Sequence, residues 1–194
     1  VVAGVRETFE EACLLPVVGG CDHREVVALR DRWRRGEKLG EMVEQAGMQL
    51  DVGALVPIAR WVTPVFQRVR FDARFYLMAL PAGQVGSHDE VESVEGCWSA
   101  PAKILERFEH RKVDLVPPTQ WMLNMLSKYN SLVDVFAFAK RQTLQPICPE
   151  ISLLGSETRL VLPGDPGHSQ ACRCLEGPTS YTLIGGRFVL NTKS

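Results

Sequence analysis

The sequence has few residues that bind metals through nitrogen or sulfur, and no pattern that brings them together. It contains four histidines and six cysteines, and no two cysteines form a Cys-x-x-Cys pair. Cys172 and Cys174 are separated by one residue, which is too close for an ordinary zinc half-site. The sequence therefore argues against a cysteine–histidine metal cluster. Cysteines scattered in this way are typical of a reducing compartment, where thiols stay free.

Long hydrophobic runs and an excess of charge are also missing. No apolar stretch approaches the roughly 18 to 20 residues that a membrane-spanning helix needs, and the first residues do not resemble a signal peptide. The formal net charge of -1 argues against a general nucleic-acid binder, which usually carries a basic surface. One local basic run is predicted to be the solvated face of a helix, the alternative being a contact for an anionic ligand. It consists of Arg30, Arg32, Arg34 and Arg35.

What the sequence does contain is the composition of a globular protein of the α/β or α+β class. Apolar residues make up 45% and charged residues 23%, close to the average of folded domains, which argues against disorder. A length of 194 residues suits one domain. We expect a main part over residues 1–142 and a strand-rich extension over residues 143–194 that packs on the same domain.

Hydrophobic periodicity predicts the individual elements. Helical patterns cover residues 1–14, 24–35, 37–48, 101–111 and 131–142, and a further helix follows Val116 to Thr119. Strand patterns cover residues 55–62, 70–80 and 91–98, and residues 181–190 predict a hairpin about Gly185-Gly186. The helix after Thr119 carries a stripe that we interpret as core packing: Trp121, Met122, Met125 and Leu126.

The strand pattern over residues 70–80 also separates two kinds of side chain. Arg70, Asp72 and Arg74 alternate with Phe71, Ala73 and Phe75, so the charged and apolar sets point to opposite faces. We interpret the charged face as solvated or ion-paired. The alternative is an arginine-lined wall for phosphate groups.

The segment Arg6-Glu7-Thr8-Phe9-Glu10-Glu11 carries the clearest chemistry. On a helix Glu7, Glu10 and Glu11 share one face, while Val5, Phe9, Ala12 and Cys13 lie opposite and anchor the helix in a core. Three carboxylates so placed repel one another, and a divalent cation such as Mg²⁺ or Mn²⁺ offsets that repulsion. The alternative is a solvated acidic face on which Arg6 pairs with Glu10.

Residues 6–14, RETFEEACL, resemble the second half of the Nudix box, REUxEExGU, in which U is an aliphatic residue. Thr8 departs from the aliphatic position, and Cys13 replaces the glycine that follows the helix, which alters how the next turn closes. The first half of the box would precede Val1. Because Val1 is not a methionine and the helical pattern is already running there, we expect the chain to be a fragment.

Four downstream segments resemble, in order, the Nudix motif 19 subfamily, the coenzyme A diphosphatases of peroxisomes and mitochondria. They are Trp61 to Pro64, Arg70 to Leu77, Trp98 with Pro101, and Leu115 to Thr119. The resemblance covers most of residues 1–130. It implies a Nudix α/β/α sandwich with a mixed sheet, whose N-terminal strands are missing from this chain, so that the fragment alone is expected to be inactive.

The resemblance also implies the roles of the site residues. Glu10 and Glu11 are the firmest ligands for Mg²⁺ or Mn²⁺, Glu7 is a third ligand or the general base, and Arg6 orients a glutamate. Many family members add a carboxylate just before a tryptophan. Glu92 fits this role best, six residues before Trp98, and Glu90 and Glu95 fit it less well.

The implied reaction is metal-dependent hydrolysis of a nucleoside diphosphate linked to another moiety. The expected substrate is coenzyme A or an acyl-CoA, cut to 3′,5′-ADP and (acyl-)phosphopantetheine; ADP-ribose, dinucleotides and cap-like molecules are alternatives. A non-catalytic Nudix-like nucleotide-binding module is the rival function. The resemblance implies a peroxisomal or mitochondrial protein, and the cytosol stays open because the C-terminal Thr192-Lys193-Ser194 is not a Ser-Lys-Leu address.

Overall fold

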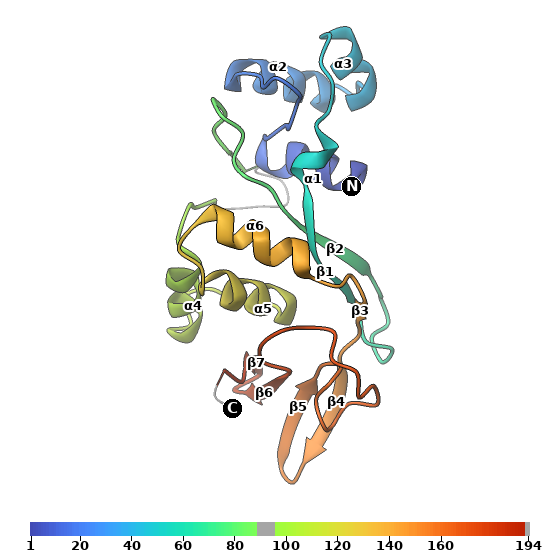
Figure 1. Cartoon of the computed structure of the whole chain (residues 1–194), viewed down its shortest axis with the longest axis vertical. Coiled ribbons are helices and arrows are strands. Elements are labelled where there is room, and N and C mark those ends of the chain that lie inside the picture. Colours follow the sequence, from blue (N-terminus) through green and yellow to red (C-terminus); the bar gives the residue numbers. More distant parts are fainter. Residues whose placement is uncertain (89–95, 193–194) are drawn as a thin grey trace. The chain divides into compact units, whose positions relative to one another are not determined.

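The computed structural model describes residues 1–88 and 96–192, which form two compact units (Figure 1). The first unit comprises Val1–Val56 and Tyr76–Trp98, and the second comprises Pro57–Phe75 and Ser99–Ser194. The predicted boundary between residues 142 and 143 does not coincide with these units, because the C-terminal strands share the second unit with three helices. That division of the chain stays a prediction.

The first unit is mainly helical. It contains α1 (Val2–Ala12), α2 (His23–Arg34), α3 (Leu39–Gln45) and a short 3₁₀ turn, η1 (Val52–Ala54). The three helices bury a common apolar core, and Phe9 of α1 meets Trp33 of α2 edge to face, with ring centroids 6.4 Å apart. The helices predicted over residues 1–14 and 24–35 are confirmed, and the one predicted over 37–48 is shorter than expected.

Local sequence sets the limits of α2. Asp22 accepts a hydrogen bond from the Glu25 backbone N–H (2.9 Å), and the Glu25 carboxylate accepts one from the Asp22 N–H (2.8 Å), which is a capping box. Gly36 follows the helix with a φ of 94°, a left-handed conformation that only glycine adopts at little cost. These two features make the chain turn into α3.

The second unit contains most of a three-stranded sheet, whose first two strands reach into the first unit by one or two residues, and the whole of a four-stranded sheet. One sheet has the order β2-β1-β3, formed by β1 (Val56–Val62), β2 (Asp72–Leu77) and β3 (Pro146–Ile147), and its β1–β3 pair is parallel with Trp61 opposite Ile147. The other sheet is the antiparallel series β4 (Glu150–Leu154), β5 (Glu157–Val161), β6 (Ser180–Ile184) and β7 (Arg187–Leu190). The predicted mixed α/β class and the hairpin over residues 181–190 are therefore confirmed.

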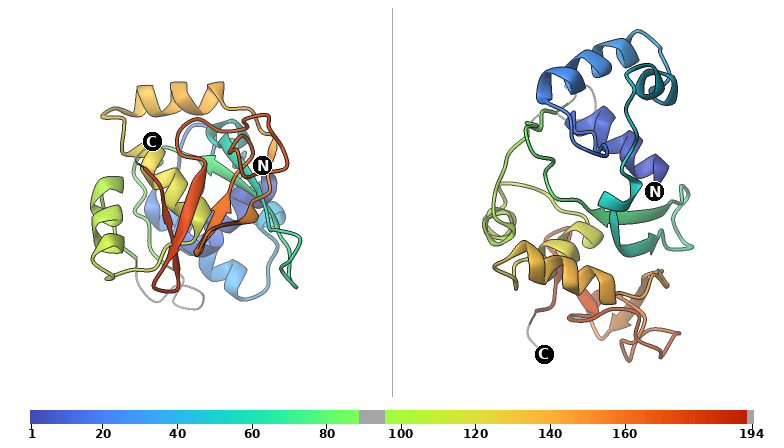
Figure 2. Two further views of the ribbon diagram at one scale, coloured as in Figure 1. Left: turned by 90° about the horizontal axis from the view of Figure 1, so that it is seen from below. Right: turned by 45° about the horizontal axis from the view of Figure 1, so that its top comes forward.

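Helices α4 (Pro101–Glu109), α5 (Pro117–Leu126) and α6 (Leu132–Arg141) complete the second unit. Helix α5 packs against α4 and contacts β7 (Figure 2). Gln120 of α5 is 1% exposed. Its side-chain amide donates to the Leu115 carbonyl (2.8 Å) and the Phe188 carbonyl (2.7 Å). Its side-chain oxygen accepts a hydrogen bond from the Leu190 N–H (3.2 Å). Trp121 and Met125 are buried, so the interpretation of that stripe as core is confirmed.

Two strand predictions need correction. The strand predicted over residues 70–80 spans only Asp72–Leu77, because Arg70 and Phe71 instead bond to Thr63 in the turn that joins β1 to β2. Most of the strand predicted over residues 91–98 lies outside the described residues, and Gly96, Cys97 and Trp98 are not in a strand. None of the helices in the described part of the chain is long and apolar enough to span a bilayer.

Candidate active site

Helix α1 presents its acidic residues on the face opposite to the core. Val5 and Phe9 are fully buried, and Cys13 is 2% exposed. The side chain of Glu7 is 49% exposed and that of Glu10 is 14% exposed, while Glu11 is exposed as well. The division of the helix into a buried apolar face and an accessible acidic face is therefore as predicted.

Arg6 connects two of these carboxylates. Its Nη1 donates to both oxygens of Glu10 (3.0 and 2.9 Å), and its Nη2 pairs with Glu7. Because Arg6 is half exposed, with 52% of its side chain accessible, such pairs contribute little to stability. Arg6 thus balances the charge of the acidic face through contacts weak enough to be exchanged for another cation.

Cys13 ends α1 in a left-handed conformation. Its φ of 54° and ψ of 40° lie in the region that favours glycine, and its N–H donates to the Phe9 carbonyl (3.2 Å). The consensus glycine of the Nudix box is thus replaced by a cysteine that keeps a glycine-like backbone. The turn closes, and Leu14 and Leu15 enter the core.

A second chain segment, Gly86 to His88, lies against the C-terminal end of α1. The Ser87 N–H donates to the carbonyl of Ala12 (2.9 Å). Upstream, Gln84 is buried and forms two hydrogen bonds with the backbone of Leu15, accepting from its N–H (2.9 Å) and donating to its carbonyl (2.8 Å). These contacts fix the segment beside the acidic face.

Arg30 of α2 also contacts the segment Gly86 to His88, through Ser87. Its Nη1 donates to the Ser87 hydroxyl (3.0 Å) and carbonyl (3.4 Å), and the residue is only 5% exposed. Among the described residues its Nε and Nη2 have no hydrogen-bond partner. The prediction that Arg30 belongs to a solvated basic face is therefore wrong, whereas Arg32 is ion-paired with Glu37 at the surface.

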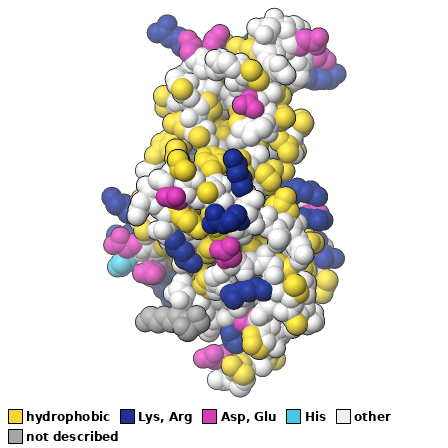
Figure 3. Space-filling model, in the orientation of Figure 1, with side chains coloured by type: hydrophobic (Ala, Val, Ile, Leu, Met, Phe, Trp, Pro, Cys, Tyr) yellow, Lys and Arg dark blue, Asp and Glu magenta, His cyan; other side chains and the backbone are white. Residues whose placement is uncertain are grey.

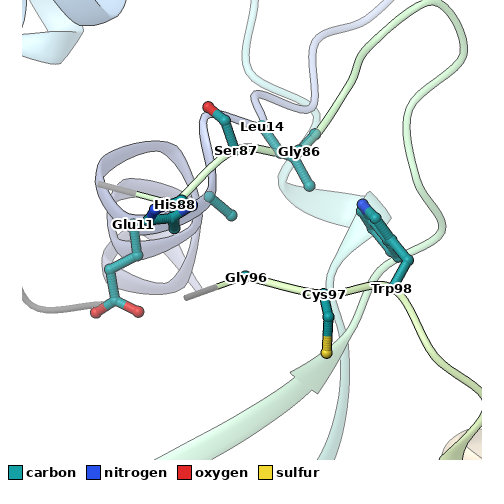
Figure 4. Close-up of a pocket in the computed structure, with 9 residues that line it drawn as sticks. Glu11, Leu14, Gly86, Ser87, His88, Gly96, Cys97 and Trp98 are labelled. Atoms are coloured by element: carbon teal, nitrogen blue, oxygen red, sulfur yellow. The ribbon is translucent and has the colours of Figure 1, made fainter. Parts of the chain in front are cut away.

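Between α1 and this segment lies a cavity of about 260 Å³ (Figure 4). Glu11 contributes its carboxylate to one side, pointing away from the helix, and Ser87, Cys97 and Trp98 contribute to the others. A Cβ on Gly86 would lie 2.9 Å from Cζ2 of Trp98, so any larger residue would force the indole to move. The cavity therefore depends on glycine at this position.

The donor set of α1 suits a hard divalent cation in chemistry. Carboxylate oxygens are the ligands that Mg²⁺ and Mn²⁺ prefer, and Mg²⁺ commonly binds one or two of them together with water and substrate phosphates. Within residues 1–88 and 96–192 no three histidine, cysteine or acidic side chains lie close enough together to form a complete metal site. Glu90, Glu92 and Glu95, predicted as a further ligand or base, lie outside the described residues.

The charged face of β2 is ion-paired, as predicted. Arg60 donates to both oxygens of Asp72 (2.8 and 2.7 Å), and Arg74 lies 3.8 Å from Asp72. The hydrogen bonds from Arg60 hold the pKa of the Asp72 carboxyl below its ordinary value. The sequence analysis assigned Arg30 to a solvated face and did not single out Ser87 or Gln84. No local signal marks their contacts, because their partners are far away in the chain.

Comparison with known proteins adds a family to this geometry. The family model that describes the NUDT19 Nudix domain matches residues 1–126. The acyl-coenzyme A diphosphatase NUDT19 of Gallus gallus is 29% identical over 168 residues, covering 74% of this chain and 44% of that protein. The proteins of the same name from Xenopus laevis and Homo sapiens are 26% and 28% identical, covering 96% and 84% of this chain and 58% and 49% of theirs. The chain thus spans about half the length of these relatives, and no solved structure matches it.

Proposed function

The chain belongs to the NUDT19 Nudix family, and we propose that its protein is a divalent-metal-dependent diphosphatase of coenzyme A or acyl-CoA. The products are 3′,5′-ADP and (acyl-)phosphopantetheine. The observation that carries this proposal is the acidic face of α1, where Glu7, Glu10 and Glu11 lie opposite a buried apolar face. The relatives named acyl-coenzyme A diphosphatase support the choice of substrate.

Each residue of the acidic face has a proposed role. Glu10 and Glu11 hold Mg²⁺ or Mn²⁺, and Glu7 is either a third ligand or the base that accepts a proton from the attacking water. A bound divalent ion neutralises the charge of the diphosphate and lowers the pKa of a bound water. Arg6 keeps the Glu10 carboxylate oriented through its Nη1 contacts (3.0 and 2.9 Å). Glu92 is proposed as an additional carboxylate of the site.

A variant series in the intact protein tests the reaction. Wild-type protein with coenzyme A and Mg²⁺ should release 3′,5′-ADP, measured by mass spectrometry, and Glu10→Gln should reduce the rate by at least about 100-fold. The matched control is Glu41→Gln, which alters an exposed glutamate on α3 that forms a surface pair with Lys38. Equal rates in wild type and Glu10→Gln would refute the assignment of the site.

The rival function is a nucleotide-binding module without catalysis, with no separate observation in its favour. Mg²⁺ titration by thermal melting addresses it, because an ion that binds the folded state alone raises the melting temperature. The proposal expects a rise in the wild type that Glu10→Gln abolishes. A shift without hydrolysis of coenzyme A, ADP-ribose, dinucleotides or cap-like substrates would favour the binding module. We further propose a peroxisomal or mitochondrial location, which imaging of the tagged intact protein tests.

A further inference from the structure

A second cavity lies entirely within the second unit and is apolar. Its volume is about 490 Å³, within the range of small-molecule sites, and no acidic or basic side chain lines it. The walls consist mainly of aromatic and proline side chains, including Trp61, Phe66, Phe71, Phe75 and Phe188. A cavity of this composition selects a hydrocarbon ligand, because it offers almost nothing to a polar one.

The alternating residues of β2 and of the turn just before it build one wall of this apolar pocket. Phe71, Ala73 and Phe75 line it, and they alternate along the chain with Asp72, which pairs with Arg60. The N-terminal turn of α5 contributes prolines, which are tolerated there because the first helical residues need no N–H bond. The sequence patterns of these segments thus keep charged side chains out of the pocket.

Part of the lining is exposed to water. Phe66 is 53% exposed and Phe71 is 67% exposed, and both lie in the turn between β1 and β2. The face drawn in Figure 3 likewise shows hydrophobic side chains at the surface among lysines and arginines. A ligand that covers such exposed apolar side chains removes them from water, which favours binding.

Two arginines adjoin residues that line the pocket. Arg70 donates from Nε to the carbonyl of Thr63 (3.1 Å), and Thr63 lines the pocket. Arg68 follows Gln67, which is also a lining residue. Among the described residues neither arginine forms an ion pair with a carboxylate. These arginines therefore favour a ligand whose hydrocarbon chain continues into an anionic part.

We propose that this apolar pocket binds the aliphatic chain of an acyl-CoA, with Arg68 and Arg70 on the side of its anionic part. The inference rests on the proposed function for the identity of the anionic part, and the pocket itself rests only on the geometry of the second unit. It makes the length of the acyl chain a determinant of affinity, whereas coenzyme A alone leaves the pocket empty.

Binding without turnover tests the proposal. The intact Glu10→Gln protein, kept in EDTA so that hydrolysis cannot interfere, is titrated calorimetrically with coenzyme A, hexanoyl-CoA and decanoyl-CoA. Each buried methylene contributes about 4-fold in affinity, so decanoyl-CoA, which has four methylenes more, should bind roughly 250-fold more tightly than hexanoyl-CoA. Equal dissociation constants for the two thioesters would overturn the proposal.

Variants then assign the effect to the pocket. Phe71→Ser should reduce the ratio of the two affinities at least about 5-fold by removing part of the wall, and Ala73→Leu should reduce it by filling the space. Val69→Ser is the matched control, since Val69 is 66% exposed in the same turn and does not line the pocket. Arg70→Gln should weaken both thioesters equally, by up to about 5-fold. An unchanged ratio in Phe71→Ser and Ala73→Leu would overturn the assignment.

Further measurements separate this proposal from its competitors. If decanoate binds as tightly as decanoyl-CoA, the occupant of the pocket is a free fatty acid. If Phe71→Ser impairs only vesicle binding, the occupant is a lipid surface, and if it impairs only self-association, the occupant is a second copy of the chain. Each of these results would overturn the proposal. Hydrolysis of coenzyme A without any chain-length effect refutes the pocket and keeps the proposed function. A chain-length effect without hydrolysis of any thioester by the wild type keeps the pocket and refutes the proposed function.

Discussion

The left-handed residue at the end of α1 makes a sharp prediction about stability. Cys13 has a φ of 54°, which costs an L-residue other than glycine about 1 to 2 kcal/mol. Its side chain is 2% exposed, so replacing it also removes a buried group. Cys13→Gly relieves the first cost and loses the second contribution, whereas Cys13→Ala keeps the strain and loses only the thiol.

The magnitudes follow from these terms. Losing the buried side chain costs on the order of 1 to 2 kcal/mol, which the relief of strain nearly offsets, so Cys13→Gly should stay within about 1 kcal/mol of the wild type. Ala12→Gly, one residue earlier in a right-handed helical conformation, should lose about 1 kcal/mol without any relief. Glycine at position 13 should be at least as stable as alanine there, the reverse of the order inside a helix.

Urea denaturation followed by circular dichroism measures these differences in the intact protein. A change of 1 kcal/mol corresponds to a melting-temperature shift of about 2 to 4 °C for a chain of this size, so a thermal melt checks the result independently. If Cys13→Gly proves less stable than Cys13→Ala by about 1 kcal/mol or more, the backbone argument fails, and the burial of the thiol dominates this position.

Three further predictions concern other positions. Gln120→Leu should lose about 2 to 4 kcal/mol in urea denaturation, because it leaves buried backbone groups of the second unit unpaired; a loss below 1 kcal/mol would contradict this. The pKa of Glu150 is lowered, first by the Ser169 hydroxyl and then by the Ser169 N–H. The contribution of the ionised Glu150 to stability is therefore present above its unfolded pKa and lost as the pH falls through its folded pKa. Glu150→Gln should flatten the acid side of the plot of unfolding free energy against pH. The same pH dependence in the variant and the wild type would contradict a contribution from Glu150. Arg30→Met should change the free energy of unfolding by no more than about 1 kcal/mol, because a buried cation with two nitrogens unpaired among the described residues stabilises little. It should nevertheless lower kcat about 10- to 100-fold, because Arg30 holds Ser87 in place. An unchanged kcat would show that Arg30 does not position the site.

The elements that local patterns determine were predictable from the sequence. Helix α1 follows from the spacing of Val5 and Phe9, because both must face the same side of a helix to be buried. The β6–β7 hairpin follows from Gly185 and Gly186, whose φ values of 55° and 82° suit the two central positions of a tight turn. In both cases the information lies within a few residues of the element that it specifies.

Features that depend on distant partners were not predictable. Arg30 is buried because Ser87 lies against it, 57 positions later in the chain, and nothing in the basic run distinguishes it from Arg32 at the surface. Gln84 follows a Pro-Ala-Gly turn and reads as a loop residue, yet it bonds to the backbone of Leu15. Such contacts require the tertiary arrangement that they help to stabilise.

The acidic face of α1 shows a different limit, since one local pattern fits two chemistries. Arg6 and Glu10 form the i,i+4 pair of an ordinary surface helix, and the same carboxylate is proposed to hold a metal. An exposed pair of this kind contributes at most about 1 kcal/mol, so it cannot by itself account for three carboxylates on one face. Our proposal of a metal site therefore draws on the surrounding structure as well. Gly86 and Ser87 enclose a cavity next to Glu11, and a merely solvated helix face has no need of a buried Arg30 to hold that segment in place.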